Sequence, residues 1–323
     1  MNWIKHKISS SSSSSSGAPS SEALPAWAPA AGESLKDGKF SDAPEYEYRE
    51  AEKWCRRVPV ASAAPIPAYL IDRINAEGCK AWDIVQPSPH SRFRGFIQNI
   101  QGHKEGGPKV VHVHSAKDCG DYCLMSNLPL MAGMYGIQGK EGVYYEVQVR
   151  QMQGTIAIGM SCQPYPEYRL PGWNRRSAAL HLDDLQIFYE DSDGGKAYDK
   201  RLKRIKEGDV IGCGYEFSTT SLFFTHNGER LDTAFVGPFA PREHFDVYAA
   251  IGMGKPEMRP GENDIIVNFG GDDQDHLFRW KPGREWAWLV DGHVGRNLGS
   301  AMEPSGSGIP GDRLPTYAET KNM

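Results

Sequence analysis

The pattern of hydrophobic and polar positions changes character after the first quarter of the chain. Before that point it predicts two helices. The first is capped by Ser41 or Asp42, has Pro44 in its first turn and continues from Glu45 to Arg57, and the second spans residues 67–77. In the first, acidic residues come at the start and Arg56 and Arg57 at the end, which suits the helix dipole. In the second, apolar residues recur on one face, and Gly78 ends the segment.

From Ala81 onward the pattern is that of short strands. Residues 143–149 alternate between hydrophobic and polar positions, which is typical of a strand with one buried face. Asn227-Gly228 lies between two such runs and predicts a type I′ hairpin. Further strands are expected at residues 82–85, 110–114, 156–160, 178–182, 210–215, 222–225, 231–235, 247–251 and 265–269. Because strands do not alternate with helices here, the pattern indicates an antiparallel sandwich or barrel and not a doubly wound sheet.

The two ends of the chain have low sequence complexity. Eight consecutive serines occupy residues 9–16, and a segment of this composition cannot bury enough apolar surface to fold. Residues 1–40 and 293–323 are therefore expected to be disordered. Residues 41–141 are expected to form a helical extension with lead-in strands that pack on the sandwich, and residues 142–292 to form the main domain.

Composition and charge narrow the range of partners. The formal net charge is −5, with no long basic run, which argues against nucleic acid binding. No apolar run is long enough to span a bilayer, and serines follow Lys5 and Lys7 where a signal peptide would be apolar. Six cysteines and no Asn-x-Ser/Thr acceptor indicate reduced thiols and a cytoplasmic location, with the nucleus as the alternative.

Six short motifs occur in order along the second half of the chain. They are Gly142–Val147, Ala157–Gly159, Arg169–Trp173, Glu207–Gly214, Phe223–Gly228 and Val267–Gly270. Together they resemble the SPRY domain, the shared half of the B30.2 module. Arg169–Trp173 matches the Leu-Pro-Gly-Trp turn of the branch that includes the Ran-binding microtubule-organising-centre proteins. The resemblance implies a concanavalin-like antiparallel β-sandwich that binds partners through loops at one end and has no catalytic role.

A looser resemblance lies upstream of these motifs. Cys79–Trp82 and Met125–Leu130 are similar to the lead-in of fungal endosomal SPRY adaptors, which serve ubiquitin ligases and carry a transmembrane segment. This sequence contains no such segment, which argues against an endosomal location.

The richest candidate for a partner site is the segment 163–176. Its tyrosines, tryptophan and arginines are the residue types that dominate interface hot spots, and its three prolines limit the entropy lost on binding. The expected partner-binding residues are Tyr165, Tyr168, Arg169, Trp173, Asn174, Arg175 and Arg176. We expect Tyr165, Tyr168, Arg169 and Arg175 to be exposed, whereas Trp173 and Leu170 have the alternative of packing under the loop.

One cluster carries the residue types of a zinc site. His112, His114, Cys119 and Cys123 lie within twelve residues, but their spacing is not that of a standard finger. The alternative is a strand with two surface histidines on one face, followed by structural cysteines. Nucleophile-elbow and phosphate-loop motifs are missing from the sequence, so neither an enzymatic activity nor a cofactor is predicted.

The C-terminal tail contains one short recruitment motif. Leu314, Pro315 and Tyr317 lie in an L-P-x-Y peptide that resembles a variant ligand of WW domains. Three hypotheses follow. The leading one is a scaffold or adaptor that binds a protein or peptide. The second is an adaptor in ubiquitin-dependent endosomal sorting that recruits a WW-domain ubiquitin ligase. The third is a metal-binding protein that uses the histidine and cysteine cluster.

Overall fold

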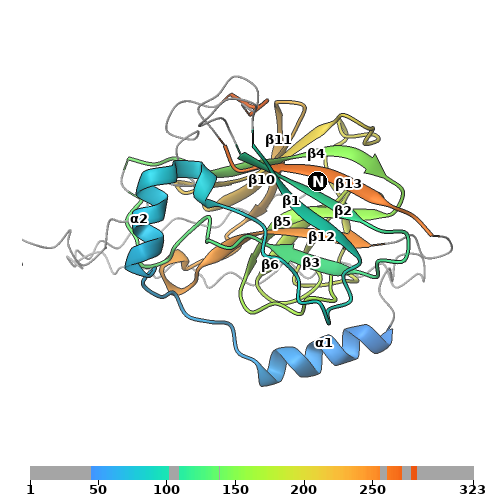
Figure 1. Ribbon diagram of the computed structural model, residues 1–323, viewed down its shortest axis with the longest axis horizontal. Coiled ribbons are helices and arrows are strands. Elements are labelled where there is room, and N and C mark those ends of the chain that lie inside the picture. Colours follow the sequence, from blue (N-terminus) through green and yellow to red (C-terminus); the bar gives the residue numbers. More distant parts are fainter. Residues whose placement is uncertain (1–44, 102–108, 138, 255–259, 271–277, 282–323) are drawn as a thin grey trace, which may run out of the picture. The chain divides into compact units, whose positions relative to one another are not determined.

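Strands dominate the part of the chain that can be described. The computed structural model describes residues 45–101, 109–137, 139–254, 260–270 and 278–281. Within these residues the strands form two antiparallel sheets that pack as a β-sandwich, preceded by two short helices (Figure 1). The predicted fold class is confirmed. The tails predicted to be disordered lie outside the described residues.

The larger sheet contains seven strands among the described residues. Its order is β1-β2-β13-β4-β9-β10-β11, and every neighbouring pair is antiparallel. The strands are β1 (Gly95–Gln101), β2 (Lys109–Ser115), β4 (Gly142–Met152), β9 (Val210–Glu216), β10 (Ser221–His226), β11 (Glu229–Val236) and β13 (Asn263–Asn268). Asn227 and Gly228 join β10 to β11 with φ values of 51° and 88°, as the predicted type I′ hairpin requires.

The smaller sheet contains six strands among the described residues, in the order β3-β12-β5-β6-β7-β8. The strands are β3 (Tyr122–Met125), β5 (Thr155–Cys162), β6 (Ser177–His181), β7 (Gln186–Tyr189), β8 (Lys196–Ala197) and β12 (Val247–Gly254). Sequence patterning did not predict β1, β3, β7 or β8. β3, β7 and β8 are only two to four residues long, too short for an alternation to stand out.

One predicted strand is wrong. Residues 82–85 make only an isolated bridge, between Ile84 and Ser126. The hydrophobic signal there comes from burial, because Trp82 and Ile84 are 1% and 2% exposed and belong to the core. The backbone is held by single bonds instead of a ladder; for example, the Val85 amide donates to the Met125 carbonyl at 2.9 Å.

The helices lie where the sequence places them. The first, α1, spans Glu45–Arg57, and the second, α2, spans Ala68–Glu77. Gly78 ends α2 with a φ of 58°, and Ile74 anchors that helix in the core. Two short 3₁₀ helices follow, η1 (Gly78–Ala81) and η2 (Arg242–His244).

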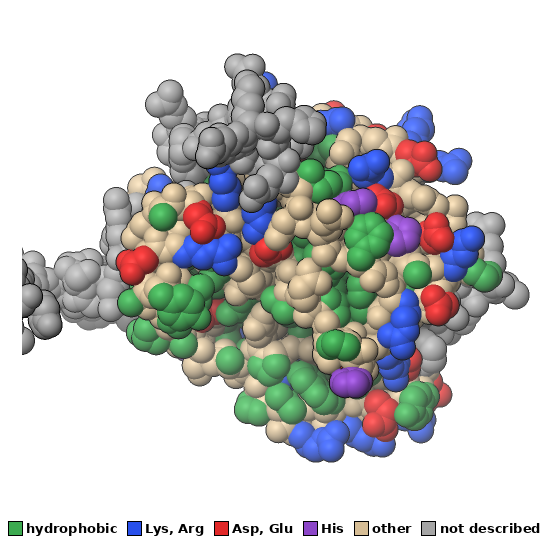
Figure 2. All heavy atoms as spheres, in the orientation of Figure 1, with side chains coloured by type: hydrophobic (Ala, Val, Ile, Leu, Met, Phe, Trp, Pro, Cys, Tyr) green, Lys and Arg blue, Asp and Glu red, His purple; other side chains and the backbone are tan. Residues whose placement is uncertain are grey.

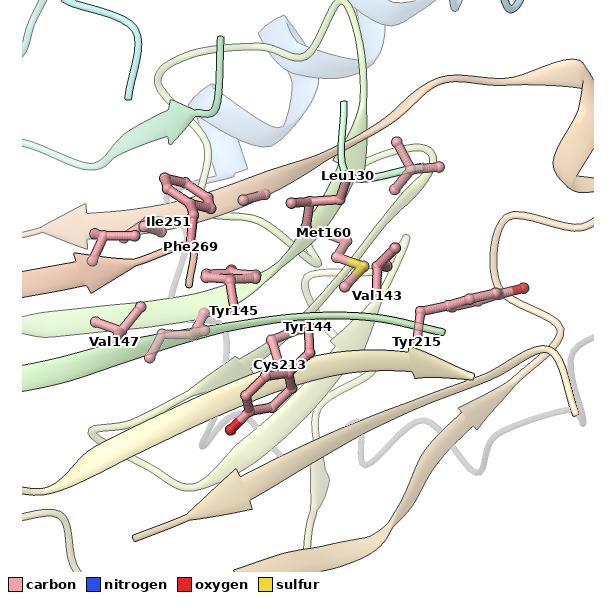
Figure 3. Close-up of a cluster of buried hydrophobic side chains, with 14 of the residues drawn as sticks. Leu130, Val143, Tyr144, Tyr145, Val147, Met160, Cys213, Tyr215, Ile251 and Phe269 are labelled. Carbon is pink, nitrogen blue, oxygen red and sulfur yellow. The ribbon is translucent and has the colours of Figure 1, made fainter. Parts of the chain in front are cut away.

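The core lies between the two sheets. Side chains of β4, β5, β9 and β12 meet there, and Figure 3 shows Tyr145, Met160, Cys213 and Ile251 among them. All four are completely buried. The Tyr145 hydroxyl crosses the core and donates to the Gly159 carbonyl on the facing sheet at 2.6 Å. Burial of this aromatic and aliphatic set is the main favourable contribution to folding.

Strand β4 is buried on both faces, which corrects the expectation of a half-buried strand. Tyr144 and Glu146 alternate with Tyr145 and lie on the opposite face of the sheet, yet they are 1% and 3% exposed. The short segment 278–281 covers them. The rings of Phe278 and Trp280 lie 4.9 and 4.7 Å from the ring of Tyr144. The alternation within β4 could not reveal this cover because the cover comes from a segment far away in sequence.

Candidate functional site

The candidate loop, residues 163–176, joins β5 to β6 and is braced from within. The Tyr165 hydroxyl donates to the Leu170 carbonyl at 2.6 Å and accepts the Asn174 amide at 3.2 Å. Ser177, the first residue of β6, donates its hydroxyl to the Asn174 carbonyl at 2.6 Å and accepts the Gly172 amide at 2.8 Å. A loop whose backbone groups are bonded in this way is preorganised, which lowers the entropy lost on binding.

The Leu-Pro-Gly-Trp turn is anchored in a small apolar cluster. Leu170, Trp173 and Phe188 are 1–2% exposed and contact one another. Gly172 has a φ of 92°, and a Cβ there would lie 2.8 Å from the Phe188 Cβ, so only glycine fits. The alternative interpretation, in which Leu170 and Trp173 pack under the loop, is therefore the correct one for both residues.

Two of the residues expected to be exposed are buried. Tyr165 is 7% exposed, because its hydroxyl serves as the internal brace of the loop, and Arg169 is 0% exposed. Asn174 is also buried, at 1%. Of the other candidates, Tyr168, Arg175 and Arg176 are half-buried. Of the seven candidates, these three half-buried side chains are therefore the ones that an outside molecule can reach, and Glu167 of the same loop is exposed as well.

Arg169 is a cation buried at the centre of the loop. Its Nε donates to Asn174 Oδ1 at 2.9 Å, and its guanidinium lies 4.7 Å from the ring centroid of Trp173. Both terminal nitrogens are buried and have no hydrogen-bond partner among the described residues. Burial lowers the pKa of Arg169, while nearby acidic groups, including Glu47 and Asp121, act in the opposite direction. Leaving both terminal guanidinium nitrogens without acceptors lowers the stability of the fold unless another group binds them.

Helix α1 lies against the same loop. The Arg175 Nη1 donates to the carbonyl of Cys55 at 2.5 Å, and the guanidinium lies 5.2 Å from the ring of Trp54. The side-chain amide nitrogen of Asn174, Nδ2, donates to Glu52 Oε1 at 3.4 Å. Ala51, one turn before Trp54 and Cys55, is completely buried. Sequence reasoning placed this helix correctly but did not predict that it contacts the candidate loop.

Arg92 contacts the candidate loop and was missed by sequence reasoning. Its guanidinium lies 5.0 Å from the ring of Tyr168, and its Nη1 lies 2.7 Å from a Glu47 carboxylate oxygen on α1. Arg92 therefore bridges the loop and the helix. An arginine that follows a stretch of prolines, serines and a histidine carries no signal for this role, since the contact depends on the fold alone.

The zinc candidates do not gather into one site. His112 and His114 share the outer face of β2, where both approach the Asp264 carboxylate, at 2.8 and 3.4 Å. Cys119 and Cys123 are buried elsewhere, and the Cys119 thiol donates to the Gly120 carbonyl. Within the described residues, no three side chains of metal-ligating type are arranged to hold an ion.

The buried thiols are not poised as nucleophiles. Burial raises the pKa of Cys162 to about 12 and also raises the pKa of Cys213 and Cys119. A thiol with such a pKa stays protonated at neutral pH, and the thiolate is the reactive form. Cys162 and Cys213 both belong to the main core cluster, where they have the role of small core side chains.

Charge is mixed over the surface that can be seen. Figure 2 shows acidic and basic side chains interspersed on the face in view, with hydrophobic side chains between them. The described residues include no helix with both the length and the apolar character that a bilayer crossing requires. Leu314, Pro315 and Tyr317, the WW-ligand candidate, lie outside the described residues.

His181 links the loop to pH. It is 1% exposed, its Nε2 lies 3.0 Å from the Pro171 carbonyl, and its ring packs 4.3 Å from that of Phe188. Burial lowers the pKa of His181. In the unfolded chain the histidine has its ordinary pKa of about 6.5, so below that pH the unfolded chain binds a proton that the folded chain does not. The free energy of unfolding therefore decreases as the pH falls below about 6.5.

We therefore expect the free energy of unfolding to fall below pH 6.5 by up to about 1 kcal/mol per pH unit from His181. Urea unfolding at several pH values between 7.5 and 5 measures it. The slope should be smaller in His181→Phe, whereas the exposed control His90→Gln should keep the wild-type slope. Equal slopes in all three proteins would contradict the assignment.

Comparison with known proteins agrees with this architecture. The SPRY domain model matches residues 142–270. The chain is 29% identical over 167 residues to SPRY domain-containing protein C285.10c of Schizosaccharomyces pombe, covering 50% of this chain and 37% of that protein. It is 29% identical over 204 residues to human Ran-binding protein 9, covering 60% of this chain and 24% of that protein.

Two further similarities are more restricted. The dual specificity protein kinase splA of Dictyostelium discoideum is 35% identical over 113 residues, which are 33% of this chain but only 5% of the kinase. A crystal structure of a human SPRY domain aligns with a TM-score of 0.39 and 21% identity, covering 55% of this chain and 99% of that domain. The chain thus contains a SPRY domain at residues 142–270, with distant similarity of about 29% to Ran-binding proteins and a fission-yeast SPRY protein.

Proposed function

We propose that this chain is a non-catalytic scaffold or adaptor whose SPRY domain binds a partner protein or peptide through the loop 163–176. SPRY domains are in general protein-interaction modules. The observation that carries the proposal is the buried guanidinium of Arg169, whose terminal nitrogens lack acceptors among the described residues, inside a braced loop. Rigid loops on a β-sandwich are a common place for recognition, and arginine beside tryptophan is a common hot-spot pair.

The half-buried side chains of the loop, Tyr168, Arg175 and Arg176, would make the first contacts with the partner. Tyr168 offers an aromatic face already ordered by Arg92, and Arg176 lies 4.6 Å from the ring of Phe245. Aromatic and arginine side chains held in place in this way add contact area at a small entropic cost. Arg169 would then add the charged anchor at the centre.

A photocrosslinking experiment tests the proposal in the full-length chain. A photoreactive phenylalanine at position 168 should capture a partner from cell extract, which mass spectrometry identifies. The same group at Phe96, an aromatic residue of β1 that is 46% exposed, is the matched control and should not capture that partner. The purified partner should then bind Tyr168→Ala about tenfold more weakly than wild type, a loss of about 1.4 kcal/mol. Unchanged affinity would exclude this loop as the binding site.

A second role concerns the C-terminal tail. The L-P-x-Y peptide at residues 314–317 supports an adaptor in ubiquitin-dependent sorting, which would recruit a WW-domain ubiquitin ligase through Tyr317. Tyr317→Ala should then abolish binding of a WW-domain array, and retained binding would exclude the motif. We place both roles in the cytoplasm, with the nucleus as the alternative, because a set of unpaired thiols such as Cys162 and Cys213 suits a reducing compartment.

A further inference from the structure

The composition and contacts of α1 distinguish it from a core helix. Its sequence, EYEYREAEKWCRR, has few apolar residues, and Tyr46 and Tyr48 are 69% and 41% exposed. Ala51 is the one fully buried residue of the helix, and none of its side chains belongs to the described core clusters. A helix attached by so few buried contacts is at the low end of local stability and can open without unfolding the domain.

The contacts of α1 instead resemble those of a bound peptide. One face of the helix holds the buried Ala51 together with the half-buried Glu47, Trp54 and Cys55. Glu47 pairs with Arg92, and Trp54 lies over Arg175. Acidic and aromatic groups on the helix thus face three arginines in and beside the loop, Arg92, Arg169 and Arg175. This is charge complementarity of the kind seen across interfaces between separate molecules.

The helix nevertheless leaves the strongest donor of the site unused. The charge of Glu47 acts on Arg169, but neither terminal nitrogen of that guanidinium has an acceptor among the described residues. The geometry of a guanidinium fork matches a carboxylate that accepts two parallel hydrogen bonds. An outside segment that places a carboxylate there would gain bonds that α1 does not make. The site therefore favours such a ligand over its built-in occupant.

We propose that α1 is a displaceable occupant of the partner site, and that the outside partner is an acidic, aromatic peptide segment that binds by replacing it. The proposal rests on the proposed function, because it assigns the partner class and the control mechanism to the same loop. While tethered, α1 competes at a high effective concentration, so partner binding is weakened in the intact chain. Release of α1 removes the contacts that the helix makes with Asn174 and Arg175, and it removes the charge of Glu47 from the neighbourhood of Arg169.

A competition experiment with a peptide of α1's own sequence tests this. The probe is a fluorescently labelled peptide of residues 45–57 with Cys55→Ser, and the hosts are full-length proteins. The release variant carries Glu52→Lys and Trp54→Ala, which remove contacts with Asn174 and Arg175. The matched control carries the same kinds of change on the exposed face, Glu45→Lys and Tyr46→Ala, at positions 75% and 69% exposed.

Fluorescence anisotropy should show the release variant binding the probe at least tenfold more tightly than wild type, and the control variant binding it like wild type. A probe with Glu47→Lys and Glu52→Lys should bind none of the hosts. Amide hydrogen exchange should show α1 losing protection only in the release variant, and an unchanged unfolding midpoint would show that the sandwich is intact. Equal affinity for all hosts, or no binding to any host, would overturn the proposal, because a site that holds α1 must accept its sequence once vacated.

This result and the test of the proposed function can fail separately. If all hosts bind the probe equally while the photocrosslinked partner still depends on Tyr168, the displaceable helix is wrong and the partner site stands. If the release variant gains affinity for the probe but the partner binds Tyr168→Ala normally, the helix site is real and the proposed partner site is wrong.

Discussion

Replacing Gly159 with alanine is expected to lower the free energy of unfolding by about 3 kcal/mol or more, as severe overpacking does. Gly159 lies in the middle of β5, directly opposite Ala179 of β6. An added Cβ would lie 2.0 Å from the Ala178 carbonyl oxygen and 2.6 Å from the Ala179 Cα. Both atoms are backbone atoms of a paired strand, so the clash can be relieved only if β5 and β6 separate. Urea unfolding followed by tryptophan fluorescence measures the loss.

Gly120→Ala is the matched control. No atom lies within 4 Å of the position that its Cβ would occupy. We expect the free energy of unfolding of this variant to stay within about 0.5 kcal/mol of wild type. The same small effect in Gly159→Ala would show that the two strands are less closely packed than the structure indicates. Because β5 and β6 carry the two ends of the loop 163–176, the Gly159 variant should also lose partner binding.

The second large effect is expected at Glu146. Its carboxylate accepts the amides of Arg279 and Trp280, both at 2.9 Å, and the Tyr144 hydroxyl at 2.7 Å. Glu146→Ala leaves these donors without their acceptor in a buried place, where each unsatisfied group costs about 1–3 kcal/mol. Some donors will regain water when the segment 278–281 detaches from the sheet. We therefore expect a net loss of about 3 kcal/mol in the free energy of unfolding.

Two measurements separate this role from a general loss of stability. Amide hydrogen exchange should show Arg279 and Trp280 losing protection in Glu146→Ala before the core strands do. The control is Glu229→Ala on β11, a carboxylate that is 70% exposed and pairs with Arg201 at the surface. Exposed ion pairs contribute about 0.2–1 kcal/mol, so this variant should stay close to wild type. Retained protection at Arg279 in the Glu146 variant would show that other contacts hold the segment.

Arg169 connects the two proposals, that the loop binds a partner and that α1 controls this binding. The residue was predicted to be an exposed contact, but it is buried in the loop, where the charge of Glu47 on α1 acts on it. A binding residue that is buried in the free protein usually implies a conformational step before binding. The release of α1 supplies that step without disturbing the sandwich, since no α1 side chain belongs to the described core clusters.

The sequence alone determined the fold class, the helix over residues 45–57 and the hairpin at Asn227-Gly228. These features depend on local periods and on turn residues with positive φ, which neighbours in sequence are sufficient to encode. The order of the six short motifs was likewise sufficient to indicate a SPRY domain, which the family model matches at residues 142–270. Short strands such as β3 and β8 were missed because a few residues cannot display a period.

Tertiary structure alone decided which side chains of the candidate loop are accessible. Tyr165 and Arg169 are residue types that are common in interface hot spots, yet both are buried in the loop. Tyr165 braces the loop backbone and Arg169 lies at its centre, and the sequence pattern alone cannot distinguish a buried role from an exposed one. The cover on Tyr144 and Glu146 and the contact of α1 with Arg175 join residues more than a hundred positions apart. Such contacts depend on where the folded sheets place distant segments. For this reason the accessible residues of the candidate loop could be identified only from the structure, whereas the fold class could be predicted from the sequence.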